Sequence, residues 1–120
     1  MPTYVDGYVL PVPKKNLDKY RAMAAKAAKV WKKHGALSYC EAVAEDMTAK
    51  FCPPFTKFMK TKPGETIVFA YVTYKSRAHR DKVNAAVMAD PTLCEGMDPK
   101  NMPFDCKRMV YSGFSAIVEA

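Results

Sequence analysis

The most concentrated group of side chains capable of chemistry lies near the C-terminus, where Asp105, Lys107 and Arg108 follow Pro103. An apolar segment comes directly afterwards, so we expect the group to lie at the start of a buried strand. A guanidinium placed there could bind a ligand carboxylate, because its planar donors match the two carboxylate oxygens. Asp105 and Arg108 could instead pair with each other and pin the loop to the sheet, and this structural interpretation is the favoured one.

Two histidines offer the next candidates. His34 comes at the end of an expected helix, close to Trp31 on its apolar stripe. Such a histidine could act as a general base or a haem ligand, or it could stabilise the helix C-terminus as a cation. His79 falls in the first turn of a second expected helix. His34 and Trp31 are retained as ligand-binding candidates, although a lone histidine is more often structural.

The remaining reactive residue types form no recognisable site. The four cysteines occur without a C-x-x-C pair and without a histidine close in sequence, which argues against zinc; they are Cys40, Cys52, Cys94 and Cys106. No Ser-His-Asp order, glycine-rich phosphate loop or acidic metal cluster occurs either. We therefore predict no metal and no cofactor. Catalytic residues stay unknown, and whether the protein is an enzyme stays open.

The elements that must position these residues follow the order β-α-β-loop-β-α-β. Strands are expected at residues 4–12, 36–45, 66–74 and 108–118, helices at 16–34 and 76–89, and long loops at 46–64 and 91–107. Asn16 and Ser76 are the expected N-caps. Asp6 interrupts the apolar first strand and would face either a cavity or an exposed sheet edge. Two βαβ halves in one domain of residues 1–120 predict an α+β, ferredoxin-like βαββαβ fold.

The net charge of +7 first suggests an anionic partner. Eight basic residues, however, lie between residues 14 and 33, largely opposite the apolar stripe of the first helix; they are Lys14, Lys15, Lys19, Arg21, Lys26, Lys29, Lys32 and Lys33. Most of the surplus is therefore the solvent face of one amphipathic helix. Lysines near Phe55 and Phe58 could bind a single-stranded nucleic acid, but no base-reading motif accompanies them. Nucleic acid is thus only a minor alternative.

The last two strands are apolar on both faces, although two helices on a four-stranded antiparallel sheet cover only one. An uncovered face of this kind would be a hydrophobic patch too large for a monomer. The simplest cover is a second copy, so we predict a homodimer whose sheets face each other. Tyr71 and Tyr111 could line an aromatic pocket in this assembly, or serve as its core.

Four stretches together resemble the YbaA-like family of uncharacterised bacterial proteins. They read YVDGYVLPVP, YRAMAAKAAKVWKKHGA, FAYVTYKSRAHRDKVNAAVMADP and MPFDCKRMVYSGF. The resemblance covers nearly the whole chain and implies a dimeric α/β barrel built from ferredoxin-like subunits. It supplies no catalytic residues.

These observations predict a small homodimer that binds, and could transform, a small organic molecule between sheet and helices. The ligand-binding candidates are Asp105, Arg108, Tyr111, His34, Trp31 and Tyr71. The competing class is a non-catalytic interaction or RNA-binding protein. The N-terminus has no signal-peptide pattern and no segment is apolar enough to span a membrane, so we expect a cytoplasmic location.

Overall fold

The computed structural model describes residues 2–95 and 97–120. Its elements are β1 (Tyr4–Pro13), α1 (Leu17–Lys33), β2 (Ser38–Val43), α2 (Phe55–Phe58), β3 (Glu65–Tyr74), α3 (Arg77–Ala89) and β4 (Val110–Ser115), with short 3-10 turns at Lys14–Asn16 and Cys106–Arg108. The four strands form one antiparallel sheet in the order β2-β3-β1-β4. This confirms the predicted ferredoxin-like α+β fold.

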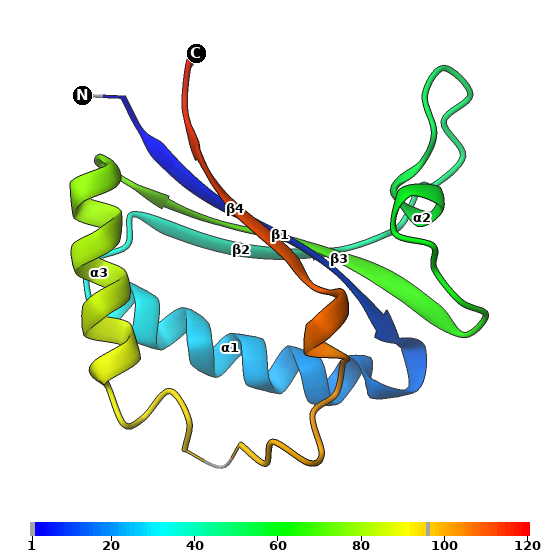
Figure 1. Ribbon diagram of the computed structural model, residues 1–120, viewed down its shortest axis with the longest axis horizontal. Coiled ribbons are helices and arrows are strands. Elements are labelled where there is room, and N and C mark those ends of the chain that lie inside the picture. The colour runs from blue at the N-terminus through cyan, green and yellow to red at the C-terminus, as the bar shows by residue number, and fades with distance from the viewer. Residues whose placement is uncertain (1, 96) are drawn as a thin grey trace.

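The two long helices lie together on one face of the sheet (Figure 1). The core between these layers has two parts. Near α3 it contains Val30, Ala36, Val72, Tyr74, Val83 and Val87, and near the start of α1 it contains Leu10, Val12, Tyr20, Ala24 and Val68. Alternation along each strand sends every second side chain into this core.

Among the described residues, no long helix covers the opposite face of the sheet (Figure 1). Phe69 and Phe114, which point to this side, have 44% and 57% of their surfaces exposed. The short helix α2 lies on this side, as Figure 1 shows, and Phe55 packs its ring edge against Phe69 with the centroids 6.0 Å apart. An apolar face that is largely uncovered in one chain matches the alternation predicted for β3 and β4.

Several boundaries differ from expectation. The strand expected over residues 108–118 is shorter in the structure, where β4 covers only Val110–Ser115. Ile117, which follows it, is 95% exposed. The region 46–64, expected to be a loop, contains the short helix α2. The two prolines directly before this helix favoured the loop interpretation. Ser76 caps α3 as predicted, with its hydroxyl accepting from the His79 amide at 3.1 Å. Asn16 does not cap α1, because its side-chain amide donates instead to the Pro103 carbonyl at 3.1 Å.

Candidate functional site

A cavity of about 260 Å³ lies between α1 and the sheet. Small residues on the sheet-facing side of α1, Ala24 and Ala27, leave this space open. The rest of the lining is mainly aromatic and aliphatic; it includes Tyr8, Leu10, Met23, Trp31, Ala70, Val72 and Phe104. An interior of this composition suits an apolar ligand body.

The loop that follows α3 closes one side of this cavity. Leu93, Met97 and Phe104 from this loop belong to the lining. Side chains of α1 hold the loop by its carbonyls: Lys26 donates to Glu95, and Lys19 donates to Asn101 at 2.5 Å. The lysines of α1 therefore include residues that fasten a loop, in addition to residues that only meet solvent.

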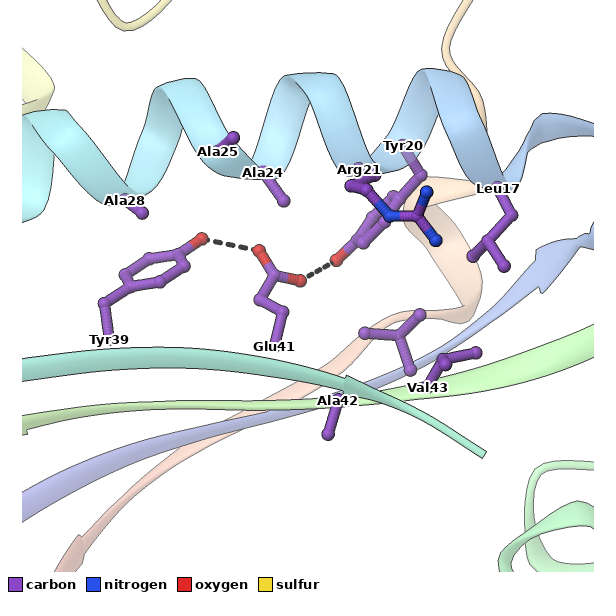
Figure 2. Close-up of a pocket in the computed structure, with 11 residues that line it drawn as sticks. Leu17, Tyr20, Arg21, Ala24, Ala25, Ala28, Tyr39, Glu41, Ala42 and Val43 are labelled. Carbon is purple, nitrogen blue, oxygen red and sulfur yellow. Dashed lines mark hydrogen bonds between the residues drawn. The ribbon is translucent and has the colours of Figure 1, made fainter. Parts of the chain in front are cut away.

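A carboxylate stands inside the apolar layer between β2 and α1. Glu41 accepts a hydrogen bond from the Tyr39 hydroxyl at 2.6 Å and another from the Tyr20 hydroxyl, one on each carboxylate oxygen. Figure 2 shows Tyr39 and Glu41 extending from β2 toward α1, while Ala42, which follows Glu41 in sequence, points away. The three side chains form a clamp, called here the Tyr20–Glu41–Tyr39 clamp.

The clamp also faces a second pocket. This neighbouring space of about 290 Å³ is lined by Leu17, Arg21, Ala24, Ala25 and Ala28 of α1 (Figure 2). It shares all three clamp residues with the first cavity. Burial is the main cause that raises the pKa of Tyr20 and Tyr39, followed by the hydrogen bond to Glu41. Both hydroxyls therefore stay protonated and act as donors to the carboxylate.

A separate buried network joins β1 to α3. Asp6 is fully buried and accepts from Arg80 at 3.0 Å and from the Asn84 amide at 3.4 Å. The same guanidinium donates to the Tyr111 hydroxyl at 2.6 Å and lies over the ring of Tyr4, 4.9 Å from its centroid. Both sequence interpretations of Asp6 are wrong, because β1 is a central strand and the carboxylate is enclosed by α3.

The predicted Asp105–Arg108 pair does not form. Arg108 binds Glu65 at the start of β3, at 2.6 Å, and also donates to the Lys60 carbonyl at 3.2 Å. The hydrogen bond from Arg108 is the main cause that lowers the pKa of Glu65. Asp105 is exposed and caps its own 3-10 turn by accepting from the Lys107 amide at 3.0 Å. The loop is pinned to the sheet as expected, but by a different carboxylate.

The other four candidates are dispersed. Trp31 lines the cavity beside α1, and its ring N–H donates to the Tyr74 hydroxyl at 3.1 Å. His34 instead contacts Asp90 at 2.7 Å and so joins the C-terminal ends of α1 and α3. Tyr71 lines a groove on the uncovered sheet face. The Tyr111 side chain lies on the helix-covered face, where its ring stacks on Tyr8 and its hydroxyl accepts from Arg80.

Sequence reasoning missed Glu41 and Arg80 as site residues. The available signal for Glu41 was its position: it alternates in step with Leu37, Tyr39 and Val43, the side of β2 that packs inward. An ionisable residue among inward-facing apolar side chains is unusual and therefore indicates a candidate functional site. Within the described ranges 2–95 and 97–120, no group of three or more metal-ligating side chains occurs, and no helix has the length and apolarity to cross a membrane.

Comparison with known proteins places this arrangement in a family. The model of the family described as "Protein of unknown function (DUF1428)" matches residues 3–106. The chain belongs to this family. It is 41% identical over 116 residues to the uncharacterized protein YbaA of Escherichia coli strain K12, with 97% of each chain covered, and equally similar to YbaA of Shigella flexneri. The resemblance inferred from the four sequence stretches is thereby confirmed.

A solved structure independently supports the fold of this family member. A dimeric ferredoxin-like protein from an uncultured marine organism superposes with a TM-score of 0.63, and each chain is covered completely. The two sequences are only 13% identical, so the likeness concerns the fold alone.

Proposed function

We propose that this protein binds a small, largely apolar organic molecule in the cavity between α1 and the sheet. The observation that carries the proposal is an apolar cavity of about 260 Å³ with a carboxylate clamp in its wall. A cavity of about 150 Å³ can hold benzene, so this one has room for a ring with a short substituent. The apolar lining would bind the body of the ligand, and the clamp would orient its polar group.

Binding is the part of the function that the geometry supports best. The clamp contains one carboxylate held in place by two tyrosine donors, and the remaining lone pairs of its oxygens can accept from a polar group of the ligand. Turnover of the ligand would be recognised by a product that differs from the added compound. The interaction and RNA-binding alternatives are less well supported, because two α1 lysines, Lys19 and Lys26, are engaged with carbonyls of the loop after α3.

A thermal-shift screen tests the proposal. The panel would contain small aromatic acids, alcohols and amines, together with haem and quinones. Compounds that bind in the cavity should raise the unfolding temperature of the wild type and of the control Ala78→Leu, whose site is exposed on α3. They should have little effect on Ala27→Leu, whose larger side chain fills the cavity. If no compound raises the wild-type value, or if Ala27→Leu responds equally, the proposal is wrong.

We also propose that two copies assemble through their uncovered sheet faces. Support comes from the exposed apolar side chains of this face, with Phe69, Val110 and Phe114 between 44% and 57% exposed. Together with Val5, Val9 and Phe55 they line a groove of about 610 Å³ that a second sheet could fill. Burial of such a surface is the main driving force for association.

Analytical ultracentrifugation tests this assembly. The wild type should sediment as a dimer at micromolar concentration, and Phe69→Glu should sediment as a monomer, because it buries a charge in the interface. The control Met88→Glu changes a residue that is 66% exposed on the helix side and should stay dimeric. A wild-type monomer would contradict the proposal.

All four cysteines are free thiols, which supports placing the dimer in the reducing cytoplasm.

A further inference from the structure

We infer that the ligand of the cavity is a compact organic cation, an ammonium group on an apolar body, whose N–H groups donate to Glu41. This inference rests on the proposed binding function and specifies the chemical class of the ligand.

Glu41 has unused acceptor capacity. An ionised carboxylate has about four lone-pair positions. Tyr20 and Tyr39 each fill one of them, on opposite oxygens. Both oxygens can therefore accept from a further donor, and the carboxylate borders both pockets from which a donor could approach.

The clamp combines one carboxylate with two neutral donors. Tyrosine hydroxyls donate hydrogen bonds but bring no positive charge. Across residues 2–95 and 97–120, no basic side chain forms an ion pair with Glu41. The two basic residues of the pocket linings are engaged elsewhere: Arg21 pairs with Asp18 at 3.2 Å, and Lys26 donates to the Glu95 carbonyl.

A charge away from bulk water is normally paired, because its transfer into an apolar layer is costly. Asp6 lies in the same helix-covered layer and is paired with Arg80. Of these two carboxylates, only Glu41 lacks a basic partner among the described residues. A ligand ammonium would supply that partner. A ligand carboxylate would be repelled, and an alcohol would donate one hydrogen bond without compensating the charge.

Aromatic side chains line the cavity beside the clamp. Trp31 and Tyr39 lie with their ring centroids 5.9 Å apart, and Tyr8 and Phe104 belong to the same cavity. Aromatic faces attract organic cations as well as apolar groups. The lining therefore suits both ends of an arylalkyl ammonium ion.

Matched probes test the inference. We would titrate the full-length protein with 2-phenylethylamine, 2-phenylethanol and phenylacetate at neutral pH, by calorimetry and by the fluorescence of Trp31, the only tryptophan. The amine should bind at least about tenfold more tightly than the alcohol, because its ammonium charge compensates the carboxylate charge, whereas the alcohol only donates a hydrogen bond to it. Phenylacetate should bind most weakly.

Glu41→Gln keeps the size of the side chain and its capacity to bond both tyrosines, but removes the charge. It should bring the affinities for amine and alcohol to within about threefold of each other, while the exposed control Glu45→Gln should keep the wild-type preference. Equal binding of amine and alcohol by the wild type, or a preference that survives in Glu41→Gln, would overturn the inference and leave the proposed cavity intact. Failure of all three probes to bind would count against both the inference and the proposed function.

Discussion

The buried pair between Asp6 and Arg80 should be the polar contact on which the stability of the fold depends most. Asp6 has no exposed surface, and the Arg80 side chain is only 13% exposed. Replacing Asp6 by Asn preserves the shape of the side chain but leaves the guanidinium charge without its buried partner. The variant therefore isolates the electrostatic part of the contact between β1 and α3.

The expected loss can be estimated from this geometry. Removing one partner of a buried ion pair typically costs about 3–5 kcal/mol. Arg80 keeps the Tyr111 hydroxyl at 2.6 Å and lies 2.9 Å from Asp81, so the lower end, about 3 kcal/mol, applies. A chain of this length has a total stability of roughly 6–18 kcal/mol. The variant should fold, but with a large part of that margin removed.

Urea unfolding at fixed protein concentration measures the effect. The midpoint should fall by about 1–3 M for Asp6→Asn. The control Asp18→Asn breaks the exposed pair with Arg21 and should change the free energy of unfolding by less than about 0.5 kcal/mol. The double variant Asp6→Asn with Arg80→Met should be more stable than the sum of the two single losses predicts. A loss below about 1 kcal/mol for Asp6→Asn would refute the assigned importance of the pair.

Two further predictions concern other contacts of the same layers. Hydrogen bonds from Thr92 and His34 lower the pKa of Asp90, so its stabilising effect is present above the unfolded-state value and fades as the pH falls below about 4. The urea midpoint of the wild type should therefore fall more steeply in acid than that of Asp90→Asn, and parallel curves would disprove this. A Cβ at Gly113 would lie 2.8 Å from Cε2 of the Tyr4 ring, so Gly113→Ala should cost about 1–3 kcal/mol in thermal unfolding, and an unchanged melting temperature would contradict it.

The fold was predictable because its elements are short and strongly patterned. In β3, alternation sends Val68, Ala70 and Val72 to the helices and leaves Phe69 and Tyr71 on the open face, as the sequence indicates. Element order then restricts the topology to very few choices. Boundaries were less predictable: β4 ends where pairing with β1 ends, and the apolar residues after it gave no sign of this.

The partners of charged side chains were not predictable from local sequence. Arg108 is three residues from Asp105, yet it binds Glu65, which is 43 positions away. Asp6 and Arg80 are 74 positions apart and meet only because α3 crosses over β1. Such pairs depend on the register of the sheet and on the placement of helices, which no single stretch of sequence contains.

The two acidic residues that face the helix layer show how burial alone fails to identify a site. Asp6 is the more deeply buried, but Arg80 and Asn84 satisfy its charge and both its oxygens, so it has little capacity left for a ligand. Glu41 is less buried, receives only neutral donors, and borders two pockets. A carboxylate that only stabilises the fold thus has its charge and its oxygens satisfied by the chain, whereas a carboxylate that binds a ligand has charge and acceptor positions left over. By that criterion we propose the Tyr20–Glu41–Tyr39 clamp as the binding site, because a ligand can supply there the positive charge that the chain does not.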